Sequence, residues 1–158
     1  FLICRRMMHD EFLGQRNHVG VLVNVWIRAS CGPVCSCVDP ITHDVVKFDC
    51  PLCFGTGRQP GYHGPYTTWC TFSPVKKQKG LQDDNTGPLS AYETSGRMTG
   101  VPELKKEDII VDKTTGRYYY VDVVSNDTEF RRVPIVQTVG LKQVPTSSPI
   151  YKLGTLLV

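Results

Sequence analysis

Cysteine is concentrated in one short stretch of this chain. Seven cysteines occur among 158 residues, and five of them fall between positions 31 and 53, in a region rich in glycine and proline. The first residues lack the pattern of a secretory signal, and an odd number of cysteines argues against a complete disulfide framework. The clustering therefore predicts a local site built from thiols rather than a set of long-range crosslinks.

Two close cysteine pairs define the candidate site. Cys35 and Cys37 are separated by one residue, and after a twelve-residue loop Cys50 and Cys53 are separated by two. Four thiolates carried on two tight turns form a tetrahedral set of soft ligands, which selects zinc first and an iron–sulfur centre second. We therefore predict a metal knuckle within residues 31–65, where a bound metal contributes folding energy to a segment with little core of its own.

The sequence leaves alternatives to this ligand set open. Cys31 can replace a member of the first pair, and His43 or His63 can substitute for a thiolate. In another alternative, the cysteines hold the loop without a metal, as reduced thiols or as disulfides. Cys4 and Cys70 are more simply buried apolar residues or disulfide partners, and the alternation of Cys70 with aromatic residues favours its burial.

The second cysteine pair belongs to a longer motif, CPLCFGTG, at residues 50–57. Its glycines relieve crowding after the second thiolate, so that backbone N–H groups can point at sulfur. The pattern C-x-x-C-x-G-x-G resembles the cysteine-rich repeat of the DnaJ-type chaperones, in which it recurs four times and binds two zinc ions. This chain holds a single copy, so we reject that family and keep the local geometry.

The rest of the chain has the short segments typical of an all-β protein. Residues 19–28 and 67–73 mix β-branched and aromatic residues with polar ones, and residues 107–112 and 117–124 flank a turn signal at 113–116. Residues 130–139, 140–144 and 149–153 are expected to close the domain, with a turn at 126–127 and with Pro134 restricting its strand to an edge or a bulge. A short helix is expected within residues 1–16. The pattern predicts a small barrel or sandwich.

We expect one overall domain made of four segments. These are an N-terminal segment with the first strand (1–30), the Cys-rich metal-knuckle insertion (31–65), a strand with a long extended hairpin or arm (66–106) and a C-terminal β segment (107–158). The arm corresponds to residues 74–102, which are rich in Pro, Gly, Ser, Thr and Asn. Their hydrophobic content is too low for core packing on their own, so an extended conformation is expected.

Charge and motifs narrow the functional classes. The formal net charge is +3, whereas dedicated nucleic-acid binders usually have a pI above about 9 and a clustered basic face. The basic run of Lys76, Lys77 and Lys79 is followed by two aspartates, as in a solvated loop. No apolar run is long enough to span a membrane, and no P-loop, GxSxG or HExxH motif occurs, so we do not expect an enzyme. The tyrosines at 118–120 are expected in core and interface rather than as a base-stacking platform.

Two regions of the chain carry a resemblance to a known family. Residues 35–40 (CSCVDP), 50–57 (CPLCFGTG) and 61–62 (GY) resemble a stretch of the neck proteins of tailed bacteriophages, in which a CxC-V-D element precedes CPxCxGTG and Gly-Gly-Tyr. Pro60 stands here in place of the first glycine of that last element. Residues 107–112, 116–121 and 137–153 are similar to the hairpin and closing strands of head-completion proteins of the same group.

This resemblance implies a virion structural protein, assembled in the host cytoplasm as a homo-oligomeric ring between portal and tail. It implies neighbouring portal, adaptor or tail proteins as partners, with DNA passing through the lumen without specific binding. Adaptor, stopper, tail-terminator and baseplate roles all stay open. The alternative hypothesis is a zinc-ribbon-like nucleic-acid-binding module that uses the lysines at 76, 77 and 79, and the least favoured is a metal-dependent or cysteine enzyme.

Overall fold

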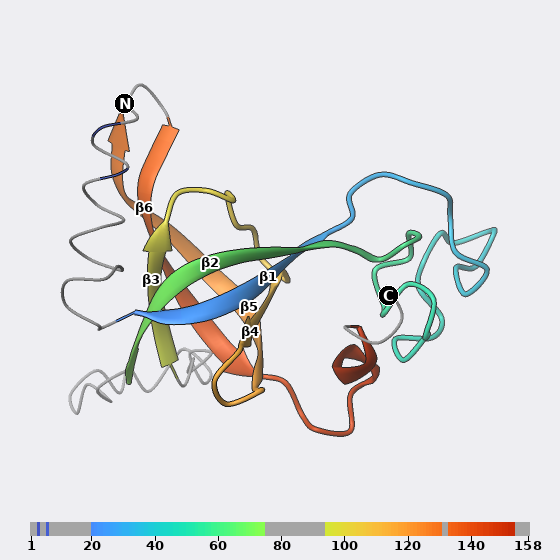
Figure 1. Cartoon of the computed structure of the whole chain (residues 1–158). Helices are drawn as coiled ribbons and strands as arrows, with labels where there is room; N and C mark the ends of the chain where they lie inside the picture. The colour runs from blue at the N-terminus through green and yellow to red at the C-terminus, as the bar shows by residue number, and fades with distance from the viewer. Residues whose placement is uncertain (1–2, 4–5, 7–19, 75–93, 131–132, 154–158) are drawn as a thin grey trace, which may run out of the picture.

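The protein folds around a closed, fully antiparallel β-barrel, which confirms the predicted all-β class (Figure 1). The computed structural model describes residues 20–74, 94–130 and 133–153, together with Ile3 and Arg6. The barrel closes in the order β1-β2-β3-β6-β5-β4. The strands are β1 (Val21–Arg28), β2 (Tyr62–Pro74), β3 (Thr94–Thr99), β4 (Ile109–Asp112), β5 (Tyr118–Phe130) and β6 (Val133–Gln143). Among the described residues, no helix is long and apolar enough to cross a membrane.

Alternation along the strands separates two hydrophobic clusters. In β1, Val25 belongs to the cluster that fills the barrel, whereas the next residue, Trp26, belongs to a second cluster on the outer face. Ile110 and Ile109 divide in the same way in β4, as a period of two requires. The inner cluster collects buried residues from every strand of the barrel and Leu104 from the loop between β3 and β4. Its strand members are Val23, Val25, Cys70, Met98, Ile110, Val121, Val139 and Leu141.

The outer cluster is covered by the end of the described chain. A 3₁₀ helix, η2 (Pro149–Lys152), begins after Ser148, whose side chain accepts a hydrogen bond from the N–H of Ile150. Ile150 and Leu153 are buried against the outer faces of β1, β4 and β5, and the rings of Tyr118 and Tyr151 lie 4.4 Å apart. The tyrosines at 118–120 therefore contribute to packing on both faces of β5, which confirms the core part of their predicted role.

Several sequence predictions about individual segments were wrong. In the predicted segment 149–153, Pro149–Lys152 form a 3₁₀ helix rather than a strand, because Ser148 and Pro149 provide a helix start. Of the predicted hairpin or arm, the arm alternative does not hold for residues 94–99, which form β3, pair antiparallel with β2 as in a hairpin and bury Met98 in the barrel. The expected turn at 126–127 lies inside β5, which continues to Phe130.

Other predicted segments are present with different bounds, or lie mostly outside the described residues. Strand β2 begins at Tyr62, five residues before the predicted start. From Val133 to Gln143, the predicted segments 130–139 and 140–144 form one continuous strand, β6. Pro134 pairs with β5 at a register irregularity between Thr128 and Glu129, so the predicted bulge at this proline is observed. Most of the predicted helix at 1–16 and most of the predicted arm lie outside the described residues.

A buried glutamine fixes the loop that closes one end of the barrel. Gln137 is fully buried in β6; its amide donates to the carbonyls of Thr99 and Pro102, and its oxygen accepts from the N–H of Leu104. These three hydrogen bonds hold Leu104 in the inner cluster. The loop connecting β3 to β4 is therefore part of the core. Because the barrel is closed, the ends of β1 and β2, which carry the cysteine region, belong to a fully paired sheet.

Candidate metal centre

The cysteines lie in a single lobe inserted between β1 and β2. We define the cysteine lobe as residues 29–61; the N–H of Ala29 donates to the carbonyl of Gly61, which closes the lobe where it leaves the barrel. Inside it, regular structure is limited to two isolated bridges, Val34 with Arg58 and Val38 with Val45. Figure 1 shows the lobe to one side of the barrel, beyond the ends of β1 and β2. The lobe therefore depends on interactions other than strand pairing.

The lobe brings the four predicted cysteines together. The sulfur atoms of Cys35, Cys37, Cys50 and Cys53 all lie within 4.8 Å of one another. The Sγ atoms of Cys35 and Cys50 are 3.7 Å apart, and those of Cys37 and Cys53 are 3.3 Å apart. A disulfide requires about 2.05 Å, whereas zinc–sulfur bonds of about 2.3 Å in a tetrahedron place the sulfurs about 3.8 Å apart. The arrangement fits four thiolates around one metal ion.

Hydrogen bonding and burial act on these thiols in opposite directions. The hydrogen bond from the backbone N–H of Cys37, against burial and with further hydrogen bonds from neighbouring side chains, lowers the pKa of the Cys35 thiol to about 6. Desolvation by the surrounding protein raises the pKa of Cys37 and also that of Cys53. Without a cation, four thiolates this close together repel one another, so all four become charged only when a positive ion shares the site.

The CPLCFGTG motif supplies backbone donors, as its spacing predicted. The backbone N–H groups of Gly57 and Gly55 bond to the sulfur of Cys53 and lower the pKa of its thiol, against the larger effect of burial. Both glycines have positive φ, +81° at Gly55 and +75° at Gly57. A Cβ on Gly55 would lie 2.8 Å from the carbonyl oxygen of Phe48, so a larger residue does not fit there.

Two residues that sequence reasoning missed connect the centre to its surroundings. Gln59 donates from its side-chain amide to the sulfur of Cys35, at 3.7 Å. The backbone of Phe54, with φ of +53°, belongs to the second cysteine turn, whereas its side chain packs in the outer cluster. Its ring centroid lies 6.4 Å from that of Tyr62. Because Trp26 of β1 belongs to the same cluster, Phe54 attaches the cysteine turn directly to the barrel.

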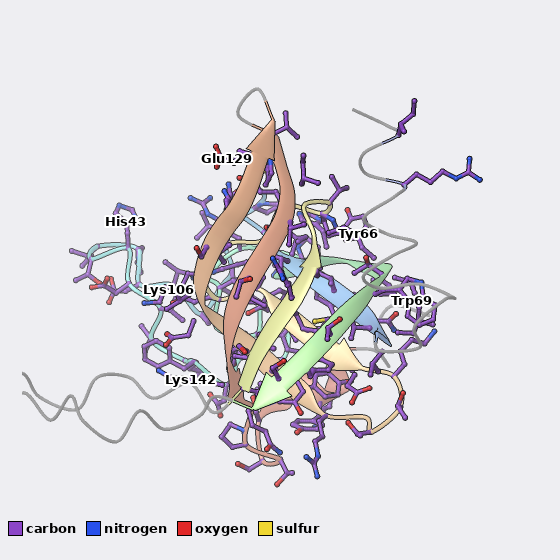
Figure 2. All side chains as sticks on the ribbon, turned by 90° about the vertical axis from the view of Figure 1, so that its left-hand side faces the viewer. His43, Tyr66, Trp69, Lys106, Glu129 and Lys142 are labelled. Atoms are coloured by element: carbon purple, nitrogen blue, oxygen red, sulfur yellow. The ribbon has the colours of Figure 1, made fainter. Side chains whose placement is uncertain are left out.

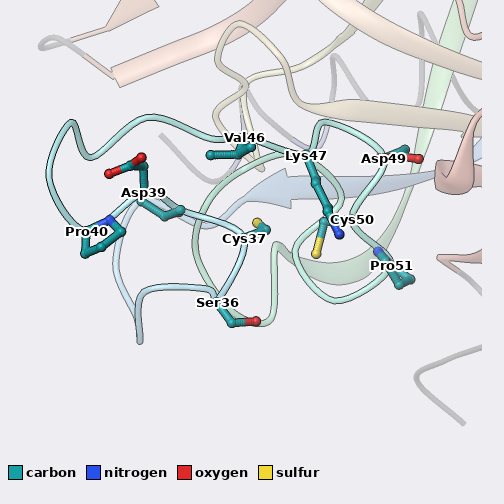
Figure 3. Close-up of a pocket in the computed structure, with 10 residues that line it drawn as sticks. Ser36, Cys37, Asp39, Pro40, Val46, Lys47, Asp49, Cys50 and Pro51 are labelled. Carbon is teal, nitrogen blue, oxygen red and sulfur yellow. The ribbon is translucent and has the colours of Figure 1, made fainter.

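A pocket opens beside the four sulfurs. It has a volume of about 590 Å³, and Cys37 and Cys50 form part of its wall. Figure 3 shows the loop that carries Asp39 and Pro40 on one side and the loop that carries Asp49 and Pro51 on the other. The pocket is therefore a surface feature of the cysteine lobe and gives direct access to the face of the centre formed by Cys37.

The other predicted site residues lie elsewhere. Cys31 is exposed and does not belong to the group of four sulfurs. His43 is exposed, and Figure 2 shows it at the outer end of the lobe, pointing away from the barrel; His63 is also exposed. Cys70 is fully buried in the barrel, as predicted. Cys4 and the lysines at 76, 77 and 79 lie outside the described residues.

The fold and this site define the class of the protein as a closed antiparallel β-barrel that carries a four-cysteine lobe able to hold a metal ion. Within the described part of the chain, no second group of histidine, cysteine or acidic side chains has comparable geometry. A comparison with protein-family models and with curated proteins finds no match.

Proposed function

We propose that Cys35, Cys37, Cys50 and Cys53 bind a zinc ion with a structural role. The proposal depends on one observation: four sulfurs converge at distances that suit a single tetrahedral ion. Four protein ligands leave no coordination position for a substrate, which is the arrangement of structural rather than catalytic zinc sites. An iron–sulfur cluster is less favoured, because a cluster of several irons separates its thiolates more widely than one ion does.

The protein as a whole is then a non-enzymatic structural subunit of the neck of a tailed bacteriophage. This part of the proposal is supported by the family resemblance of residues 35–40, 50–57 and 61–62, segments that in this structure surround one four-cysteine centre. In this role, copies of the chain form a ring between portal and tail, contact the neighbouring neck or baseplate proteins and surround the passing DNA without reading its sequence. A stiff, metal-held lobe on a barrel suits such a subunit, since it projects from the core without needing one of its own.

The cysteine lobe does not favour the alternative of a nucleic-acid-binding module. It contains three aspartates, Asp39, Asp44 and Asp49, against the two cations Lys47 and Arg58. A net negative lobe repels phosphate, and four thiolates around a divalent ion add further negative charge. DNA binding by the monomer thus serves as a contrary outcome in the test rather than as a second proposal.

Native mass spectrometry combined with metal analysis tests both parts of the proposal. We expect one zinc per chain and a homo-oligomer of defined stoichiometry. Cys50→Ser should lose the zinc and lower the melting temperature, whereas the matched control Cys31→Ser, at an exposed cysteine outside the centre, should retain both. An unchanged metal content in Cys50→Ser would remove the centre from the proposal. A metal-free monomer that binds DNA tightly would refute the neck assignment.

A further inference from the structure

The cysteine lobe displays an unusual number of exposed apolar side chains. Five large hydrophobic residues in this short segment are each more than half exposed, with Ile41 at 87% and Phe48 at 78%; the others are Val34, Val46 and Leu52. A folded monomer seldom leaves so many large apolar groups in water within one small region, and such surfaces commonly mark an interface. Within the lobe itself, the hydrophobic cluster consists of the four cysteines and the partly buried Val38, whereas the ring of Phe54 is buried against the barrel.

The pocket beside the four sulfurs adds a concave element to this surface. Its wall combines the apolar residues Val38, Val46 and Pro51 with the charged residues Lys47 and Asp49. A volume of about 590 Å³ accommodates one or two side chains of another protein. Convex apolar groups next to a mixed pocket are typical of a protein-binding surface.

Charge indicates which partner suits this surface. The cysteine lobe has a formal charge of −1, and a divalent ion held by four thiolates contributes a further −2. Since the whole chain is +3, the residues outside the lobe sum to +4, and the described residues of the barrel account for +1 of this. Exposed cations on the described barrel include Lys105, Lys106, Lys113 and Arg117. Another copy of the same chain therefore offers the complementary charge.

We propose that the exposed face of the cysteine lobe is the contact through which one copy of the chain docks onto the barrel of the next. The contact joins two different surfaces, lobe to barrel, and repetition of such a contact closes into a ring when the rotation between neighbouring copies divides a full turn. The inference rests on the ring assembly proposed above and identifies the surface that makes it. Apolar groups such as Phe48 supply the affinity, and the opposite charges of lobe and barrel orient the approach.

A pair of double variants tests the apolar part. In Ile41→Thr/Phe48→Thr, the lobe loses its two most exposed large side chains, and in the control Val123→Thr/Val133→Thr, two exposed valines of the β5–β6 hairpin are changed in the same way. Sedimentation velocity and native mass spectrometry over a concentration series should show the half-assembly concentration rising ~30-fold or more for the lobe variant. The control should assemble like the unmodified chain. Bound zinc per chain reports whether the lobe stays folded.

The outcomes separate this inference from the proposed function. Assembly of the lobe variant at the unmodified concentration, with zinc retained, overturns the lobe contact and leaves the ring intact. An unmodified chain that stays monomeric at every concentration overturns ring assembly itself, and the inference with it.

A charge variant keeps the test decisive if the lobe variant loses zinc. Asp49→Lys, on the pocket rim, should weaken assembly at low salt, whereas Glu103→Lys, which makes the same charge change at an exposed barrel position beside Lys105, should not weaken it. The difference should shrink as salt is raised. Equal effects of the two substitutions would refute the inference.

Discussion

Phe54 offers the sharpest test of how the cysteine lobe is attached to the barrel. Its side chain is 8% exposed and lies in the outer cluster with Trp26 and Tyr62, although its backbone belongs to the cysteine turn. Its φ of +53° is a left-handed conformation that residues with a Cβ adopt at a cost. Two substitutions, Phe54→Ala and Phe54→Gly, therefore remove the same ring but differ in backbone strain.

The burial and the φ angle fix the expected magnitudes. Truncating a buried phenylalanine to alanine costs about 3–5 kcal/mol, and because the lobe can relax around the gap we expect about 3 kcal/mol for Phe54→Ala. Glycine removes the left-handed penalty of about 1 kcal/mol. Phe54→Gly should thus be destabilised by about 2 kcal/mol only. This order reverses the usual one, in which glycine is the more destabilising replacement.

Urea unfolding in zinc-saturated buffer measures both variants. Trp26 is almost fully buried in the same cluster as Phe54, so its part of the tryptophan fluorescence, the other part coming from Trp69, reports on this cluster. Val38, a partly buried lobe residue without positive φ, provides the control, because there glycine should cost more than alanine. If Phe54→Gly proved less stable than Phe54→Ala, the left-handed anchor would be refuted. If both variants kept the unmodified stability, the ring would have no role in joining lobe to barrel.

Three further predictions concern the barrel. Gly96→Ala should lower stability by about 1–3 kcal/mol in urea unfolding, because its Cβ would lie 3.0 Å from the sulfur of Cys70; adding Cys70→Ala should restore part of the loss. Gln137→Leu should cost about 3 kcal/mol, since it removes the side-chain partner of two buried backbone groups and one partly buried backbone group. Hydrogen exchange at the Leu104 N–H should accelerate. Burial raises the pKa of Asp108, so its carboxyl group binds a proton more tightly in the folded chain than in the unfolded chain. The contribution of Asp108 to the free energy of unfolding should therefore grow as pH falls through the folded-state pKa, and it should level off below the ordinary aspartate pKa. Asp108→Asn should abolish that component of a stability–pH profile.

The sequence predicted those parts of the fold that depend on local pattern. Alternating β-branched and aromatic residues located β1 and the β4–β5 hairpin, since these segments bury apolar side chains on both faces. The predicted barrel is also observed. In contrast, β3 has the sequence TSGRMT, with a single large apolar residue. Its strand conformation depends on pairing with β2 and β6 and on the room that Gly96 leaves for Cys70, which are tertiary effects.

For the candidate site too, the sequence predicted the features that are local in the chain and missed those that depend on tertiary contacts. Cysteine spacing located the four sulfurs, because ligands on two tight turns are close in sequence as well as in space. Phe54 and Gln59 were missed, although both lie within a few residues of Cys53. A positive φ at a phenylalanine and a hydrogen bond between Gln59 and Cys35 arise only after the lobe folds back onto β2. In the motif, the related signal was the presence of glycine at 55 and 57, and the structure gives both of them a positive φ.

The composition of the cysteine lobe explains why a metal and an apolar surface would occur together. A segment of this length without a metal must bury its large apolar residues to offset the loss of chain entropy. Here the described core of the lobe consists of cysteines and Val38, while Ile41 and Phe48 point into solvent. If zinc supplies the folding free energy, those side chains are released from core packing and become available to a neighbouring copy. The proposed metal and the proposed contact thus depend on each other: a lobe that kept its shape without metal would need its apolar residues inside, where no second chain could reach them.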